Sequence, residues 1–175
     1  LAGKLSGGMK QKLALACTLI YRPRIIFLDE PTTGVDPVSR REFWIILSNL
    51  LKEDITIIIS TPYMDEAERF NRIAMLDNGK ILALDTPNNI KSMMKEVIVE
   101  IVCTPVREAY KLLKEYTEFE IQIFGDRLNA AVDNNEDNER LIREILETNS
   151  VKITDLRTIT PSLENAFIHL IKENN

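Results

Sequence analysis

Ser6, Gly7 and Gly8 stand at the start of a predicted helix, where these residue types suit the binding of a phosphate group. A helix N-terminus offers unpaired backbone N–H groups and a partial positive charge. Two glycines allow the backbone to approach a ligand closely, and a serine hydroxyl adds one donor. The same residues could also form only a loop and a helix cap.

A second group that could do chemistry is the pair of adjacent carboxylates Asp29 and Glu30, which follows the apolar run 25–28. Such a run predicts a strand buried on both faces of a parallel sheet. Ligands bind beyond the carboxyl ends of the strands in these sheets, so we expect both carboxylates to face a crevice. The same sequence would also suit a buried strand followed by an acidic turn that binds nothing.

The two stretches together, Leu5–Gln11 and Ile25–Asp36, resemble the signature motif and the Walker B motif of ATP-binding cassette (ABC) ATPases. The resemblance is to the exporter branch of ATP-binding proteins (ABC-2-like or multidrug). It implies that Ser6, Gly7 and Gly8 contact the γ-phosphate of an ATP molecule held by the opposite subunit. Met9 stands where glutamine is commoner in the family.

The resemblance also implies roles for three carboxylates and a set of partners. Asp29 would hold Mg²⁺ through water, Glu30 would polarise the attacking water, and Asp36 would act across a dimer. The cofactors would be ATP and Mg²⁺, and the partners a second nucleotide-binding domain and a transmembrane permease. We therefore expect an ATPase that energises export and lies in the cytoplasm, peripherally attached to the inner face of the cell membrane.

Two departures from the family pattern limit this expectation. None of the six glycines lies in a Gly-x-x-x-x-Gly-Lys-Ser/Thr pattern, so the Walker A loop is absent. We expect the chain to be part of a longer protein and to be inactive alone. Pro62 stands where active members usually carry a histidine, which predicts a degenerate ATP site. The single histidine, His169, is predicted to lie on a surface helix.

The sequence predicts an α/β fold with two domains. Residues 1–95 would be the C-terminal part of an ABC nucleotide-binding domain with a parallel sheet, and 96–175 a small ferredoxin-like accessory domain. The second prediction rests on the order strand-helix-strand-strand-helix-strand between Val97 and Leu156. A further helix is expected after Thr160, and 133–140 is predicted to be a solvated turn.

Local patterns predict several further elements of the first domain. The helix that Ser6 caps is expected to be largely buried, with Cys17 in the core. Asp36 and Pro37 predict the start of a second helix. Asp65 and Glu66 are interpreted as acids in the first turn of a helix, where its dipole favours them.

Composition excludes some functions and leaves others open. A net charge of −5, from 27 acidic and 22 basic residues, offers no basic face, so no nucleic-acid partner is predicted. No apolar stretch reaches the length of a membrane span. The alternatives that remain are a soluble ABC protein acting on ribosomes or DNA and a non-catalytic interaction module.

Overall fold

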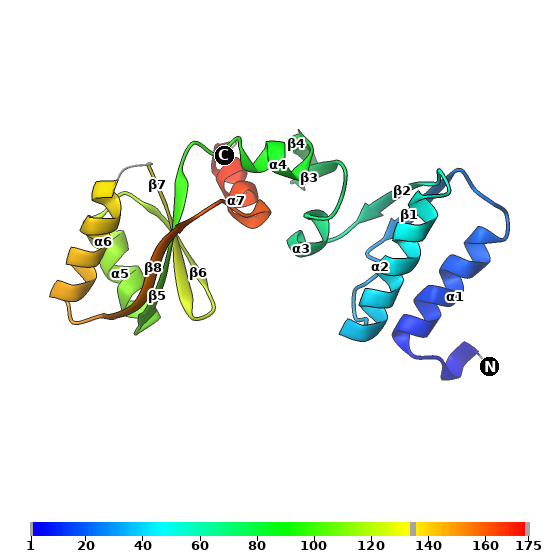
Figure 1. Ribbon diagram of the computed structural model, residues 1–175, viewed down its shortest axis with the longest axis horizontal. Coiled ribbons are helices and arrows are strands. Elements are labelled where there is room, and N and C mark those ends of the chain that lie inside the picture. The colour runs from blue at the N-terminus through cyan, green and yellow to red at the C-terminus, as the bar shows by residue number, and fades with distance from the viewer. Residues whose placement is uncertain (1, 134–135, 174–175) are drawn as a thin grey trace. The chain divides into compact units, whose positions relative to one another are not determined.

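The computed structural model describes residues 2–133 and 136–173 (Figure 1). The chain divides into two compact units, Leu1–Ala67 and Glu68–Asn175. The elements of the first unit, in chain order, are η1 (Ala2–Lys4), α1 (Gly7–Leu19), β1 (Ile25–Asp29), α2 (Pro37–Leu51), β2 (Thr56–Ser60) and α3 (Met64–Ala67).

A two-stranded parallel sheet forms the centre of the first unit. Ile26 of β1 pairs with Ile57 of β2, and Asp29 pairs with Ser60 at the carboxyl ends of both strands. Helices α1 and α2 lie beside each other in Figure 1. Together with Ile26 of the sheet, they form a cluster of buried apolar side chains. The buried members of that cluster are Leu15, Ile26, Phe43, Leu47 and Leu50.

Two burial predictions for this unit are wrong. β1 is covered on one face only, because Phe27 is 73% exposed while its neighbour Ile26 is 2% exposed. Helix α1 is mostly exposed rather than buried, and Cys17 is exposed rather than part of the core. The reason is that successive strand residues point to opposite faces, and helices α1 and α2 cover only the face of the narrow sheet that holds Ile26.

The helix boundaries in this unit follow local signals that the sequence carries. The Ser6 side chain accepts a hydrogen bond from the Met9 amide at 3.3 Å, which confirms it as the N-cap of α1. Asp36 caps α2 in the same way, with Pro37 in the first turn. Before Pro23, Arg22 has a positive φ of 47°, so it lies outside helical geometry as predicted.

The second unit begins with a hairpin and continues into an antiparallel sheet. Its elements are β3 (Ile73–Asp77), β4 (Lys80–Asp85), α4 (Pro87–Lys91), β5 (Val97–Thr104), α5 (Val106–Tyr116), β6 (Glu120–Phe124), β7 (Arg127–Val132), α6 (Glu136–Thr148), β8 (Lys152–Ile159) and α7 (Leu163–Glu173). Asn78 and Gly79 join β3 to β4, and both have positive φ, as the predicted type I′ turn requires.

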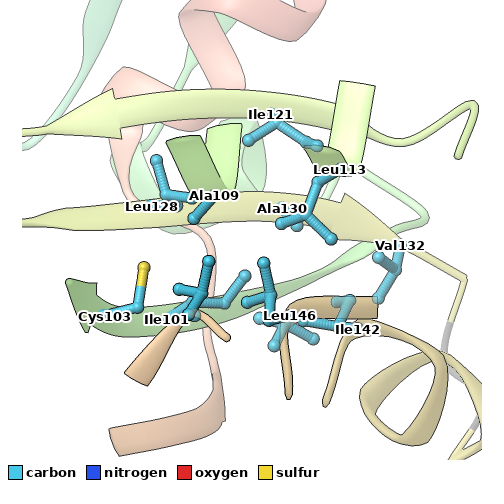
Figure 2. Close-up of a cluster of buried hydrophobic side chains, with 12 residues drawn as sticks. Ile101, Cys103, Ala109, Leu113, Ile121, Leu128, Ala130, Val132, Ile142 and Leu146 are labelled. Atoms are coloured by element: carbon cyan, nitrogen blue, oxygen red, sulfur yellow. The ribbon is translucent and has the colours of Figure 1, made fainter. Parts of the chain in front are cut away.

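The ferredoxin-like order is confirmed. Its four strands pair antiparallel in the order β6-β7-β5-β8. Helices α5 and α6 lie on one side of this sheet (Figure 1). Figure 2 shows the core between them, where Leu113 of α5 and Leu146 of α6 meet Ile101 and Leu128 of the sheet. All four of these side chains are fully buried.

The predicted turn over 133–140 is partly wrong, because α6 already begins at Glu136; residues 134–135 lie outside the described part.

Helix α7 begins at Leu163, after a reciprocal cap. The Ser162 amide donates to the Asn165 side chain at 3.0 Å, and the Asn165 amide donates to the Ser162 hydroxyl at 3.2 Å.

Candidate functional site

Asp29 and Glu30 lie where β1 ends, and the neighbouring strand holds both of them. The Ser60 hydroxyl donates a hydrogen bond to the Asp29 carboxylate. The Glu30 amide lies 3.1 Å from the Ser60 hydroxyl and 3.1 Å from the Ser60 carbonyl oxygen. One serine of β2 therefore holds the Asp29 carboxylate and the Glu30 backbone. Sequence reasoning did not single out Ser60.

Glu30 has an unusual backbone conformation, with a positive φ of 42°. Left-handed geometry is uncommon for a residue with a side chain and costs free energy that the surroundings must offset. The Thr33 hydroxyl donates to the Glu30 carboxylate at 3.2 Å, and the Thr33 amide donates to the Glu30 carbonyl at 3.1 Å. The turn after β1 thus holds an exposed carboxylate in a defined place.

The space beside Asp29 is open and largely apolar. A hollow of about 220 Å³ is lined by Phe27, Leu28, Asp29, Ile58 and Ser60. Pro62, the second residue after β2, is exposed. Thr61 accepts a hydrogen bond from the Tyr63 amide at 3.1 Å, so the backbone turns around Pro62.

The N-terminus of α1 packs against the loop and helix that follow Glu30. Gly8 is buried, and a Cβ atom there would lie 2.3 Å from the Cβ of Ser39 on α2. A Cβ on Gly7 would meet only the Gly34 carbonyl oxygen, at 3.5 Å. The need for glycine at position 8 is therefore explained by helix packing, whereas Ser6 and Gly7 are the exposed members of the motif.

Asp36 is exposed, and its carboxylate accepts a hydrogen bond of 2.9 Å from the Ser39 amide. This bond holds the pKa of Asp36 below its usual range. Asp36 therefore stays ionised at neutral pH while it caps α2. Among the described residues, the hydrogen bonds of Ser6 and Asp36 share no partner with those of Asp29.

Glu66 contradicts the interpretation of a simple first-turn acid. Its side chain is fully buried and accepts hydrogen bonds from Thr32, Arg40 and Thr61, each of 2.7 Å. Asp65, by contrast, is exposed, and its one ion-pair partner among the described residues is Arg40, at 2.9 Å. The sequence held no signal for this difference, because the partners of Glu66 come from three separate segments.

The chemistry of these donors suits Mg²⁺ only in part. Mg²⁺ is commonly held by one or two carboxylates together with substrate phosphates and water. Asp29 with the Ser60 hydroxyl offers such a partial set, and Glu30 lies next to it. Within residues 2–133 and 136–173, no group of three acidic, histidine or cysteine side chains could hold a metal ion. A phosphate ligand would have to supply the remaining oxygens.

Comparison with known proteins matches both ends of the chain to one class. Residues 1–33 match the family model described as ABC transporter. Residues 86–171 match the model described as ATP-binding protein DrrA1-3-like, C-terminal domain. The chain belongs to the ABC transporter ATP-binding proteins. It carries the C-terminal portion of the nucleotide-binding domain and a DrrA-type C-terminal domain, so the resemblance is confirmed.

Individual relatives of this ABC protein place it in the DrrA and YbhF branch. It is 33% identical over 174 residues to "Daunorubicin resistance ATP-binding protein DrrA2" of Streptomyces coeruleorubidus, covering 96% of this chain and 54% of that one. It is 48% identical over 85 residues to "Probable multidrug ABC transporter ATP-binding protein YbhF" of Escherichia coli, covering 49% and 15%. The chain thus spans about half the length of the DrrA2 relative.

One solved structure with partial similarity is CbiO1 of Clostridium perfringens, described as part of the ABC transporter complex CbiONQ. The identity is 31% and the TM-score 0.48, over 52% of this chain and 37% of that one.

Two further features of this ABC protein concern its helices. His169 lies on α7, where its side chain is only 15% exposed and its Nε2 atom is 3.4 Å from Glu173; it is less exposed than predicted. None of the described helices combines the length and the apolar character that a membrane crossing requires.

Proposed function

We propose that this chain is part of the ATP-binding and ATP-hydrolysing subunit that energises a membrane exporter. The observation that carries the proposal is the placement of Asp29 and Glu30 at the end of β1, fixed by Ser60. The similarity to resistance and multidrug ATP-binding proteins supports the exporter branch. The proposed partners are a second nucleotide-binding domain and a transmembrane permease on the inner face of the membrane.

Each motif residue has a proposed role in this function. Mg²⁺ with the ATP phosphates would supply charge neutralisation of the transferring group. Asp29 would orient the metal's water ligands, and Glu30 would accept a hydrogen bond from the attacking water and direct it. Ser6 and Gly7, with the Gly8 backbone amide, would donate to the γ-phosphate in the opposite subunit's site. Asp36 would act across the same dimer.

The domain limits and the state of the ATP site are also proposals. We propose that the nucleotide-binding part extends to about residue 95 and that 96–175 is an accessory domain for regulation or subunit pairing. Pro62 has no side-chain donor in the place where the family carries a histidine. We therefore propose that the site completed by Glu30 and Pro62 is slow, and that Ser6 completes the productive site on the partner.

Three variants of the full-length protein with its permease test these assignments. Loss of one transition-state donor costs about 10²–10³ in rate, so the Pro62 site should already contribute little. Ser6→Arg should abolish most ATP turnover because its bulk fills the γ-phosphate pocket. Glu30→Gln should have a small effect, and Pro62→His alone should not greatly raise the rate. Glu53→Gln, in the exposed turn after α2, is the matched control for a lost surface charge.

The alternative outcomes have distinct meanings. Loss of turnover in Glu30→Gln with full activity in Ser6→Arg would reverse the assignment of the two sites. Loss in both, with acceleration in Pro62→His, would indicate a symmetric dimer with two slow sites. A wild-type assembly that hydrolyses no ATP would overturn the proposed function.

A further inference from the structure

A buried carboxylate joins three segments of the first unit. Glu66 of α3 has no exposed surface. Its Oε1 atom accepts from the Thr32 hydroxyl and from Arg40 Nε, and its Oε2 atom accepts from the Thr61 hydroxyl. Thr32 belongs to the turn after β1, Arg40 to α2, and Thr61 to the segment after β2. A single side chain therefore fixes the spacing between three parts that are distant in sequence.

We propose that Glu66 is a positioning residue for the ATP site, an inference that rests on the proposed function. Thr32 lies two residues after Glu30, in the turn that leads to Asp36. Thr61 directly precedes Pro62. Through these two threonines, Glu66 holds the turn of Glu30 and the segment of Pro62 at a fixed distance.

A carboxylate is required because all three partners donate. An ionised carboxylate is an acceptor only and can receive several hydrogen bonds, whereas an amide places two hydrogens on one side. In Glu66→Gln, one amide oxygen replaces the two acceptor oxygens of the carboxylate, so Thr32, Arg40 and Thr61 can no longer all donate to this side chain. A threonine hydroxyl that faces the amino group must rotate in order to accept. The link between the two segments, which depends on both threonines, is therefore loosened.

Arg40 provides a way to separate this role from simple charge pairing. Its Nη2 atom lies 2.9 Å from Asp65, and its guanidinium lies 5.0 Å from the centre of the Tyr63 ring. Asp65 is on the same short helix and pairs with the same arginine, and its side chain is 66% exposed. Its only described partner is Arg40, so Asp65→Asn is a matched control for Glu66→Gln.

The decisive measurement is amide hydrogen exchange in the full-length protein. In Glu66→Gln, we expect exchange at Thr33, Val35 and Tyr63 to accelerate about tenfold or more, because a hydrogen bond to a charged group is lost. The interior of α2 should keep its wild-type exchange rates. Asp65→Asn should leave all of these rates unchanged.

ATP turnover provides the functional measurement on the same variants. The variants are compared in the Ser6→Arg background, which isolates the site of Glu30 and Pro62. There, Glu66→Gln should lower kcat about tenfold while the affinity for a non-hydrolysable ATP analogue stays unchanged, because misplaced groups slow the reaction without weakening binding. Asp65→Asn should retain the kcat of the Ser6→Arg parent.

Several results would overturn the proposal. Uniform acceleration of exchange throughout the unit would assign Glu66 to general stability, and acceleration at Tyr63 alone would confine it to its own loop. Faster exchange with an unchanged kcat would remove the positioning role. If Glu66→Gln does not fold, Thr32→Val replaces it as the test. This variant must accelerate amide exchange at Thr33 and Val35 while the Tyr63 amide keeps its wild-type exchange rate. A wild-type protein without ATPase activity would overturn only the proposed function, because exchange requires no hydrolysis.

Discussion

The backbone amide of Glu30 donates a hydrogen bond of 3.1 Å to the hydroxyl of Ser60, and the same hydroxyl donates to Asp29. A single side chain of β2 thus orients the two acidic residues of β1 and its turn. This arrangement follows from the parallel register, in which Asp29 and Ser60 are direct partners at the carboxyl end of the sheet.

Ser60→Ala should lower kcat for ATP in the full-length protein by several-fold in any site that Glu30 serves, because the Asp29 carboxylate and the Glu30 backbone amide lose their common hydrogen-bond partner. To isolate that site, turnover is measured in a Ser6→Arg background. Ser48→Ala is the matched control, since the Ser48 hydroxyl donates to the Trp44 carbonyl on α2. Equal kcat values for Ser60→Ala and its parent would contradict the orienting role.

Gly8→Ala should destabilise the packing of α1 on α2 by about 1–3 kcal/mol, the usual cost of overpacking. The new Cβ would lie 2.3 Å from the Cβ of Ser39 and 3.2 Å from a methyl carbon of Val35. Urea unfolding of the chain, followed by Trp44 fluorescence, gives the measurement. Gly7→Ala is the control, because its Cβ would make only an ordinary contact.

The double variant Gly8→Ala/Ser39→Gly tests the cause of that destabilisation. Removing the Ser39 side chain vacates the space that the new Cβ needs, so part of the lost stability should return. A double variant that is no more stable than the sum of the two single changes predicts would show that the clash with Ser39 is not the cause.

Glu100 should make the second unit more stable above about pH 4.5 than in acid. Arg157, at 2.8 Å, and then Arg127, at 3.2 Å, hold the pKa of Glu100 below its ordinary value, while partial desolvation opposes them. The stabilisation is complete above the ordinary glutamate pKa of about 4.3. It is lost as the pH falls through the lower pKa that Glu100 has in the folded protein.

Glu100→Gln should therefore cost about 1–3 kcal/mol at pH 7 and much less in acid. Urea unfolding of the chain, followed through the backbone NMR signals of β5 and β8, measures both conditions. Glu147→Gln is the control, because Glu147 forms an exposed pair with Arg143 on α6. A cost that does not depend on pH would refute the ionic contribution.

This chain alone should show no ATP turnover and no micromolar affinity for Mg-ATP. The phosphate-cradling amides and the lysine of a Walker A loop are absent from its sequence. Calorimetric titration with Mg-ATP measures the affinity directly. Micromolar binding would indicate a phosphate site that the known motifs do not explain.

The isolated chain should also self-associate. One face of the β1–β2 sheet exposes Ile25, Phe27 and Ile58 by 51%, 73% and 49%, and exposed apolar strands favour association. Phe27→Ser should weaken the association seen by sedimentation, whereas Val38→Ser, at an equally exposed position on α2, should not. A monomer at high concentration in the wild-type chain would contradict this prediction.

The sequence by itself determined the features that depend on neighbours along the chain. Ser6 and Asp36 cap the helices that they precede because each hydrogen bond spans three residues. The order of elements from β5 to β8 could be predicted for a similar reason, since segments with the apolar periodicity of strands alternate clearly with segments that have the periodicity of helices. The motif spacing between Ser6 and Asp36 was sufficient to indicate the family.

Only the tertiary structure decided which of these side chains are buried and what they contact. Glu66 and Asp65 are adjacent acids, yet Glu66 alone is buried, because its partners lie 34 and 26 residues away at Thr32 and Arg40. Likewise, Gly8 must lack a side chain because Ser39 of another helix occupies that space. Burial depends on which elements pack on each face, and the pattern of a single strand such as β1 does not contain that information.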